Sequence, residues 1–138
     1  MKTFYVGVKG VIVRDGKVLV LHTNANHENR GDRWEMPGGR IDGDETIEQA
    51  LNRELTEELP NIQNIKIGEI LSAHRVSVDV KGNVSLVLVF YRVNADFEGG
   101  EPELSEEHLE FQWADQATAL GLVEDNTLHA IVQIFKGK

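Results

Sequence analysis

The sequence predicts an α/β protein in which helices pack on a central mixed β-sheet. Runs of β-branched and aromatic residues alternate along the chain with two segments of helical periodicity, as is typical of such a fold. Hydrophobic residues make up 41% of the chain and charged residues 27%, which is typical of a folded globular protein. Because 138 residues is an ordinary length for one domain, we expect residues 1–138 to form a single domain.

The first part of the chain predicts a β-hairpin followed by a loop. Residues 6–13 and 17–22 are rich in aliphatic residues, and Asp15-Gly16 between them is a turn dipeptide. Residues 23–33 are polar and rich in asparagine and glycine, so we expect a loop there. Residues 37–39, Pro-Gly-Gly, then predict a sharp break in the backbone that neither a helix nor a central strand would carry.

Residues 46–59 predict an α-helix. Thr46 is a good N-cap, Gln49 is placed to complete a capping box, and Pro60 ends the helix. The apolar residues of the segment share one side of a helical wheel, which we expect to face the sheet. They are Ile47, Ala50, Leu51 and Leu55.

The second half of the chain predicts two further strands joined by a turn, then a short strand and a C-terminal helix. The strands are expected at 66–80 and 84–93, with the turn at 81–83. Residues 94–107 form an acidic segment with glycines and a proline, and we expect a loop. A short strand is expected at 109–113 and a helix at 123–135.

Charge and cysteine content exclude several classes of function. Acidic residues number 23 against 14 basic ones, a net charge of −9, so nucleic acid and anionic membranes are unfavourable partners. The chain has no cysteine, which excludes disulfides, thiolate nucleophiles and cysteine metal sites. We find no signal peptide and no uncharged apolar run of membrane-spanning length, and therefore expect a cytoplasmic protein.

The helix at 46–59 carries carboxylates on its apolar side. At roughly 100° per residue, Glu54 and Glu58 project within about 20° of Ile47, and Glu57 lies at the edge of the same sector. Partly buried carboxylates are costly unless they are protonated or bound to a cation. One interpretation is an ordinary solvated acidic face, but the position of these glutamates on the apolar side of the helical wheel argues against it. The other is a site for Mg²⁺, or for Mn²⁺ as a substitute, since both prefer oxygen ligands.

These residues resemble a known family motif. The motif residues are Gly39, Glu45, Arg53, Glu54, Leu55, Glu57 and Glu58, at the spacing G-x5-E-x7-R-E-U-x-E-E, where U is a bulky apolar residue. This spacing resembles the Nudix box of the Nudix hydrolases and would occupy residues 39–61. Pro60 stands where the family pattern has a C-cap glycine, so the helix must end differently here.

The resemblance implies an α/β/α sandwich around a mixed sheet and hydrolysis of a nucleoside diphosphate linked to another group. It implies that Glu54, Glu57 and Glu58, with the carbonyl of Gly38, bind the metal. It further implies that Glu45 and Arg53 form an ion pair between the loop and the helix.

Two glutamates are candidates for the base that takes the proton of the attacking water. Glu54, shared with metal binding, is the first candidate. Some family members use a loop glutamate, and Glu107 resembles the distal metal-binding glutamate of MutT-like members. The alternative for Glu107 is one charge among several in an acidic loop, and the two interpretations carry equal weight.

The substrate implied by the resemblance is a nucleoside triphosphate, oxidised or not, cleaved to a monophosphate and pyrophosphate. Residues 33–39 resemble the corresponding segment of MutT-like members. Asn126 falls near their purine-reading asparagine, with capping of the last helix as the alternative. Trp34 would stack on a base or pack beneath the loop. Arg33 and Arg40, with Arg30, flank the expected cleft and would bind phosphates or remain solvated.

Alternatives remain open at this point. One is a non-catalytic nucleotide-binding or sensor module on the same fold. Others are a hydrolase of ADP-ribose or of dinucleotide polyphosphates, and an RNA 5′-end pyrophosphohydrolase, which the negative charge disfavours. The expected partner is a small nucleotide, and a homodimer is possible. The five histidines show no ligand spacing and are interpreted as structural or surface groups.

Overall fold

The computed structural model describes residues 3–26, 31–77 and 84–137. The expected turn at 81–83, the end of the strand expected at 66–80, and Arg30 lie outside these residues. The described elements follow the order β1 (Thr3–Arg14), β2 (Lys17–Thr23), β3 (Trp34–Glu35), β4 (Gly38–Arg40), α1 (Ile47–Glu58), β5 (Ile62–Ser77), β6 (Val84–Phe97), β7 (His108–Ala114), α2 (Gln116–Leu122) and α3 (Asp125–Lys136).

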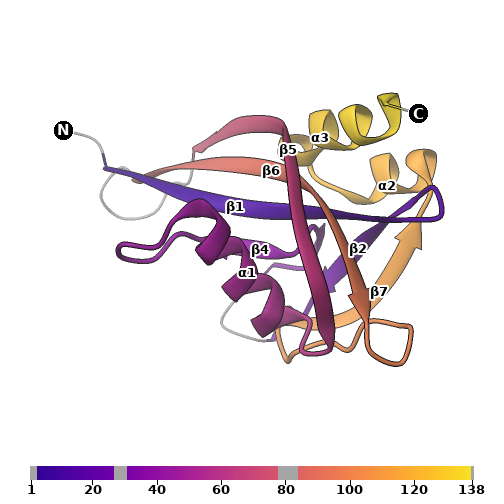
Figure 1. Cartoon of the computed structure of the whole chain (residues 1–138). Coiled ribbons are helices and arrows are strands. Elements are labelled where there is room, and N and C mark those ends of the chain that lie inside the picture. The colour runs from indigo at the N-terminus through magenta and orange to yellow at the C-terminus, as the bar shows by residue number, and fades with distance from the viewer. Residues whose placement is uncertain (1–2, 27–30, 78–83, 138) are drawn as a thin grey trace.

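The strands form a mixed sheet. Within the described ranges its main order is β3-β2-β1-β6-β5, with β4 paired to β1 and β7 paired to β2. The long pairing of β1 with β6 is parallel, and the other pairings are antiparallel. Helix α1 lies on one side of this sheet, while α2 and α3 lie on the other (Figure 1). The expected α/β/α arrangement is confirmed.

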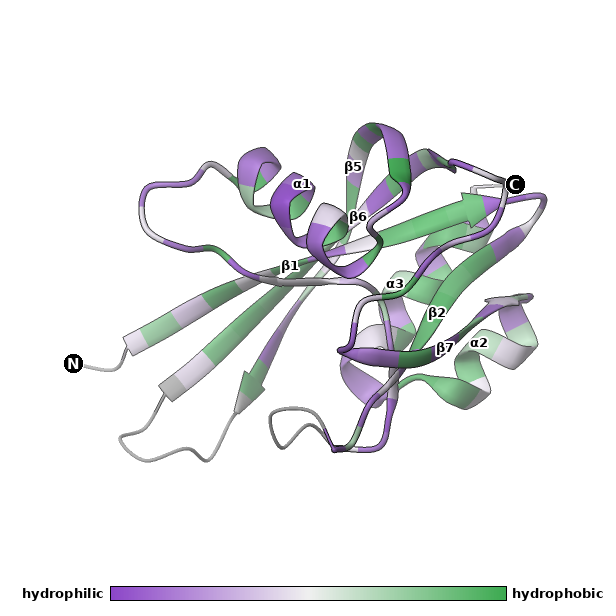
Figure 2. Cartoon of the chain, turned by 90° about the horizontal axis from the view of Figure 1, so that it is seen from below, coloured by the Kyte–Doolittle hydropathy of each residue, from purple (hydrophilic) through white to green (hydrophobic). Residues whose placement is uncertain are grey.

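Two hydrophobic clusters occupy the two faces of the sheet. On β2, Leu19 and Leu21 pack with α1, while Val18 and Val20 pack with α2 and α3. This alternation follows from the two-residue period of a strand. Strands β1, β2 and β6 accordingly show mainly hydrophobic residues between the helices in Figure 2. Among the described residues, none of the helices is long and apolar enough to span a bilayer.

Helix α1 begins as its sequence predicts. The Thr46 hydroxyl accepts a hydrogen bond from the Gln49 N–H (3.1 Å), and the Gln49 side chain accepts one from the Thr46 N–H (2.9 Å). At the other end, Leu59 closes the helix at φ −128° and ψ 78°, outside the left-handed region, as expected without a C-cap glycine. The expectation for Ile47 is wrong, because its side chain is 39% exposed in the first turn.

Several short elements differ from the sequence predictions. Residues 38–40, expected as a backbone break, pair with β1 as strand β4. Strand β6 extends to Phe97, into the segment expected as a loop. The expected C-terminal helix is preceded by a separate short helix, α2, whose N-cap Asp115 accepts a hydrogen bond from the Thr118 N–H (2.9 Å).

Candidate active site

Strand β4 brings the glycine pair against both β1 and α1. Gly38 has φ +143°, and a Cβ atom there would lie 2.0 Å from the carbonyl oxygen of Val8. A Cβ atom on Gly39 would lie 2.5 Å from the carboxyl carbon of Glu54. A side chain at Gly38 would collide with the β1 backbone, and one at Gly39 would displace the Glu54 carboxylate, so the two glycines allow the helix carboxylates to approach the strand backbone.

Glu58 is the most buried of the predicted site residues on α1. It is 2% exposed, and its Oε2 accepts a hydrogen bond from the Gly38 N–H (3.1 Å). Its Oε1 is buried and has no hydrogen bond to any group that the structure describes. Burial raises the pKa of the Glu58 carboxyl well above its ordinary value; Lys9 opposes this, and nearby carboxylates add to it. A buried oxygen of this kind fits a cation ligand, because a bound cation would compensate for its lost hydration.

Glu54 and Glu57 lie closer to the surface than Glu58. The Glu54 side chain is 16% exposed and the Glu57 side chain 56%. Both face Arg53, whose Nη1 lies 2.8 Å from Glu54 and 3.5 Å from Glu57. The three glutamates thus run from the interior to the surface along one side of α1, next to the glycine pair. As the helical wheel predicts, Glu58 and Glu54 lie on the partly buried side of α1, and Glu57 lies at the edge of that side.

Arg53 connects α1 to the loop that precedes it. Its Nε and Nη2 donate to the Glu45 carboxylate at 2.6 and 2.9 Å, and Nη2 also donates to the Arg40 carbonyl (3.1 Å). The hydrogen bonds from Arg53 and from the Asp42 N–H lower the pKa of Glu45 to about 2. The pair implied by the resemblance is therefore present, and it braces the loop beside the glutamates.

The sequence patterns did not indicate one buried group that lies next to Glu58, the side chain of His108. His108 has a fully buried side chain, and its Nε2 lies 2.9 Å from Glu35 Oε2 and 3.8 Å from Glu58 Oε1. One ligand atom from each of Glu35, Glu58 and His108 lies within 4.8 Å of the others, in the described part of the chain. His108 is thus adjacent to the site rather than a general structural histidine. Its position directly after the candidate residue Glu107 is the feature of the sequence that could have indicated that His108 lies near the site.

Glu35 lies between three cationic or potentially cationic side chains. Burial alone would raise the pKa of the Glu35 carboxyl. The charge of Lys9 and the hydrogen bond from His108 outweigh burial, with a further contribution from Arg33, so that pKa lies well below its usual range. Lys9 Nζ lies 3.7 Å from Glu35 Oε1 and donates to the carbonyl of Met36 (3.2 Å). Glu35 is consequently an anion beside Glu58, whose pKa shifts in the opposite direction.

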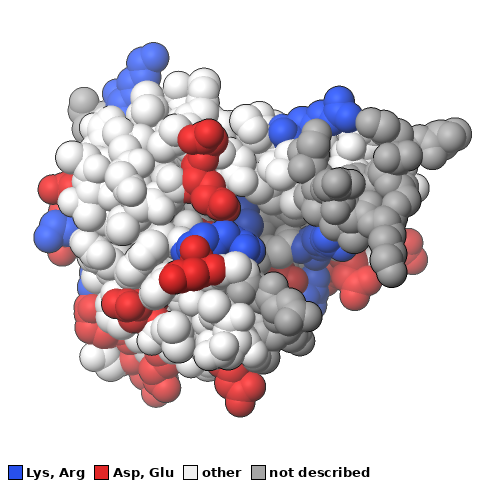
Figure 3. Space-filling model, turned by 180° about the vertical axis from the view of Figure 1, so that it is seen from behind, with Lys and Arg blue, Asp and Glu red and all other residues white. Residues whose placement is uncertain are grey.

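Two adjoining cavities meet at this network. The larger, of about 500 Å³, is lined by five of the predicted polar residues, Arg33, Arg40, Glu54, Glu57 and Glu107, whereas Glu45, Arg53 and Glu58 are not part of its lining. Its lining is Gly7, Lys9, Arg33, Glu35, Gly38, Gly39, Arg40, Glu54, Glu57, Leu86, Leu88 and Glu107. Acidic and basic side chains gather side by side around a hollow on the face shown in Figure 3. Glu107, a candidate because it resembles the distal metal-binding glutamate of MutT-like members, lines the same cavity as Glu54 and Glu57.

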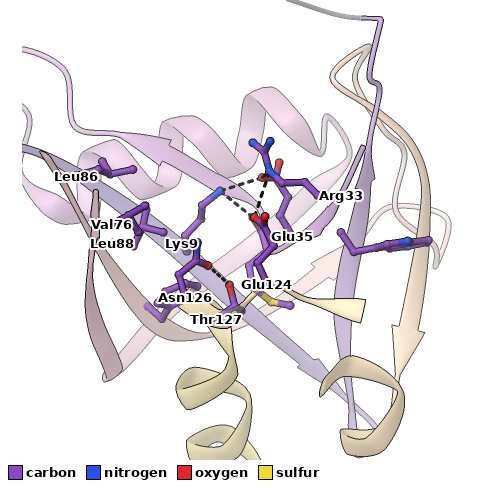
Figure 4. Close-up of a pocket in the computed structure, with 12 residues that line it drawn as sticks. Lys9, Arg33, Glu35, Val76, Leu86, Leu88, Glu124, Asn126 and Thr127 are labelled. Atoms are coloured by element: carbon purple, nitrogen blue, oxygen red, sulfur yellow. Dashed lines mark hydrogen bonds and ion pairs between the residues drawn. The ribbon is translucent and has the colours of Figure 1, made fainter. Parts of the chain in front are cut away.

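The smaller cavity, of about 330 Å³, is more apolar. Its lining is Lys9, Arg33, Trp34, Glu35, Met36, Val76, Leu86, Leu88, Phe90, Glu124, Asn126 and Thr127 (Figure 4). Five of these residues also line the larger cavity: Lys9, Arg33, Glu35, Leu86 and Leu88. An elongated ligand with a flat apolar end and an anionic end matches this pair of spaces.

The predicted substrate-binding residues divide between the cavities. Arg40 lines the larger one and lies over the ring of Tyr5 at 4.4 Å. Trp34 lines the smaller one and stacks on His22 with ring centroids 4.7 Å apart. Asn126 also lines the smaller one. The alternative role of Asn126 as a helix cap is wrong, because α3 has Glu124 as its N-cap.

Comparison with known proteins identifies the family. The NUDIX domain matches residues 3–131 of the chain. The chain belongs to the NUDIX family. Together with its named relatives, this match makes the chain a Nudix hydrolase of the MutT-like type.

Three relatives illustrate the similarity. A Mycobacterium tuberculosis protein named "Putative 8-oxo-dGTP diphosphatase 2" is 37% identical over 110 residues, covering 80% of this chain and 72% of the relative. The Escherichia coli CTP pyrophosphohydrolase is 41% identical over 71 residues, about half of each chain (51% and 50%). The crystal structure of a MutT Nudix hydrolase from Burkholderia pseudomallei has a TM-score of 0.77 at 25% identity, covering 96% of this chain and 98% of that one.

Proposed function

We propose that this Nudix hydrolase cleaves nucleoside triphosphates to monophosphates and pyrophosphate, with Mg²⁺ as the metal. The observation that carries the proposal is the buried Glu58 oxygen beside the glycine pair, which itself lines a cavity together with Glu54 and Glu57. The two named relatives act on triphosphates according to their names, which supports this substrate class.

The proposed metal ligands are the carboxylates of Glu54, Glu57 and Glu58 and the carbonyl of Gly38, with Glu107 as a further ligand. When bound, divalent cations lower the pKa of an attacking water and stabilise negative charge on the phosphates. A protein of net charge −9 needs such cations to hold a polyphosphate.

The protein's own residues supply orientation and proton transfer. Phosphoryl transfer depends mainly on positioning and charge neutralisation, and the Arg53–Glu45 pair fixes the loop beside the reacting groups. In this proposal the Glu54 carboxylate accepts the proton of the attacking water, and Glu107 is the alternative base. Arg33 and Arg40 line the larger cavity, where their guanidinium groups would contact phosphate oxygens.

A nucleotide panel with Mg²⁺ or Mn²⁺ tests this proposal, with pyrophosphate and phosphate measured separately. We expect pyrophosphate release from triphosphates, and a fall of roughly a thousandfold or more in kcat for Glu58→Gln. Glu48→Gln is the matched control, since Glu48 lies on the exposed side of the same helix. Preference for ADP-ribose or a dinucleotide polyphosphate would replace the substrate assignment. Undiminished turnover in Glu58→Gln would reject the catalytic site.

A further inference from the structure

Lys9 is a charged residue in an otherwise buried stretch of β1. Its neighbours Val8 and Gly10 are buried, and its own side chain is 14% exposed. It lines both cavities at the point where they meet. Because burying an ammonium group is costly, a lysine here needs acceptors on several sides.

The protein supplies part of what this ammonium group needs. Lys9 Nζ has three N–H donors and cannot accept a hydrogen bond. One donor reaches the Met36 carbonyl at 3.2 Å, and Glu35 Oε1 lies 3.7 Å away. Within the described part of the chain, these two contacts, on the side of β3, leave one donor of Nζ for a ligand in the cavities. Figure 4 shows Lys9 between the apolar side chains of Leu86 and Leu88 and the Arg33–Glu35 pair.

The smaller cavity combines apolar walls with polar groups that donate. Leu86, Leu88 and Phe90 supply a surface that suits a flat heterocycle. Asn126 accepts a hydrogen bond at Oδ1 from the Thr127 hydroxyl (2.7 Å), and its N–H₂ group, which has no hydrogen bond to the described residues, can donate to a ligand.

The two carboxylates of this lining already face a cation. Arg33 Nε lies 3.3 Å from Glu35 Oε1 and 3.8 Å from Glu124 Oε1. The second oxygen of Glu35 is bonded to His108 at 2.9 Å. The groups near Lys9 therefore favour a ligand whose edge accepts hydrogen bonds.

We propose that Lys9 selects nucleotides whose base carries a carbonyl oxygen where other bases carry an exocyclic amino group. The favoured substrates are thus 6-oxopurine and 4-oxopyrimidine nucleotides, and this selection rests on the proposed function. A carbonyl oxygen accepts from the ammonium group, whereas an amino group would place two donors face to face and leave one donor of the partly buried ammonium group without an acceptor. Arg40 lines the larger cavity beside Gly39 and Glu54, so the phosphates have a separate cation there.

Two pairs of nucleotides, each differing only in whether the base carries a carbonyl or an amino group, test the selection. The specificity ratios to measure are those of kcat/KM for ITP over ATP and for UTP over CTP, with Mg²⁺. We expect both ratios to exceed about ten in the wild type and to approach one in Lys9→Met, which keeps the length of the side chain and removes its donors. Lys17→Met, at an exposed lysine on β2, should keep the wild-type ratios.

Binding of IMP and AMP without metal gives a second readout that is independent of turnover. The wild type should bind IMP at least about tenfold more tightly than AMP, and this measurement stands even if Lys9→Met fails to fold. Ratios near one in the wild type would overturn the inference. An equal loss for all four triphosphates in Lys9→Met would also overturn it and assign Lys9 to the phosphates. Selective binding of IMP without hydrolysis of any nucleotide would instead contradict the proposed function and leave the base selection standing.

Discussion

Gly39 and Glu54 approach each other so closely that the size of residue 39 determines where the carboxylate lies. The carboxyl carbon and both oxygens of Glu54 would lie within 2.7 Å of a Cβ atom on Gly39. Contacts this short require one group to move, and here it is the end of a side chain that we propose as a metal ligand. The glycine pair therefore matters for the position of Glu54 as well as for the turn of the chain.

Gly39→Ala should lower kcat/KM by roughly tenfold to a hundredfold, because a displaced carboxylate loses its position relative to the metal and water. The loss of stability should be smaller, within about 1–3 kcal/mol, because the Glu54 side chain can rotate away. Nucleotide turnover and urea unfolding measure the two effects.

Gly121→Ala is the control for this substitution. A Cβ atom at Gly121 meets nothing within 4 Å, and the residue lies in α2. It should gain about 0.5–1 kcal/mol of stability and keep full activity. Wild-type activity in Gly39→Ala would show that the Glu54 position is not decisive.

The site residues that the sequence missed share one property. Lys9, Glu35 and His108 come from separate strands, and Glu35 and His108 meet across 73 residues of sequence. No local spacing encodes such a meeting, because it depends on the pairing of β2 with both β3 and β7. Glu54, Glu57 and Glu58, in contrast, were recognised because helical periodicity places them on one side of a single helix.

The ion pair between Arg53 and Glu45 connects helix α1 to the loop that precedes it. Glu45 has a pKa of about 2 in the folded protein, below its ordinary value of 4.5, because of hydrogen bonds from Arg53 and from the Asp42 N–H. A lowered folded-state pKa means that the pair stabilises the fold above pH 4.5. This contribution is then lost as the pH falls from about 4.5 toward 2.

Glu45→Gln should therefore be less stable than the wild type near neutral pH, and the difference should shrink to nothing as the pH approaches 2. Thermal or urea unfolding across this pH range measures the difference. Glu103→Gln, at an exposed carboxylate outside the helices, should follow the wild type throughout. A constant difference between Glu45→Gln and the wild type at all pH values would exclude the proposed linkage.

Elements with a long, regular pattern were predicted well. The α1 boundaries follow from the capping box, and the β1–β2 turn follows from Asp15-Gly16, whose φ angles are 51° and 76°. Strands β3 and β4 have two and three residues, too short for any periodicity, and form because β2 and β1 pair with them. Helix α2, of seven residues, is similarly short, although Asp115 was a recognisable N-cap signal.

The fold places a cavity lined by carboxylates next to a more apolar cavity. Helix α1 supplies carboxylates to the larger cavity, and α3 on the other side of the sheet supplies part of the lining of the more apolar cavity through Asn126 and Thr127. Strand β1 passes between them and carries Lys9, which lines both cavities. The arrangement explains how a strongly acidic protein is suited to an anionic ligand, provided that cations occupy the carboxylate end.

Mn²⁺ titration without nucleotide measures whether the α1 glutamates hold a divalent cation, as we propose. The wild type and Glu48→Gln should bind Mn²⁺ alike, observed by the loss of free Mn²⁺ signal in electron paramagnetic resonance. Glu58→Gln, which keeps the shape of the side chain and removes its charge, should weaken binding at least about tenfold. Equal Mn²⁺ affinity in all three proteins would show that Glu58 does not bind the cation.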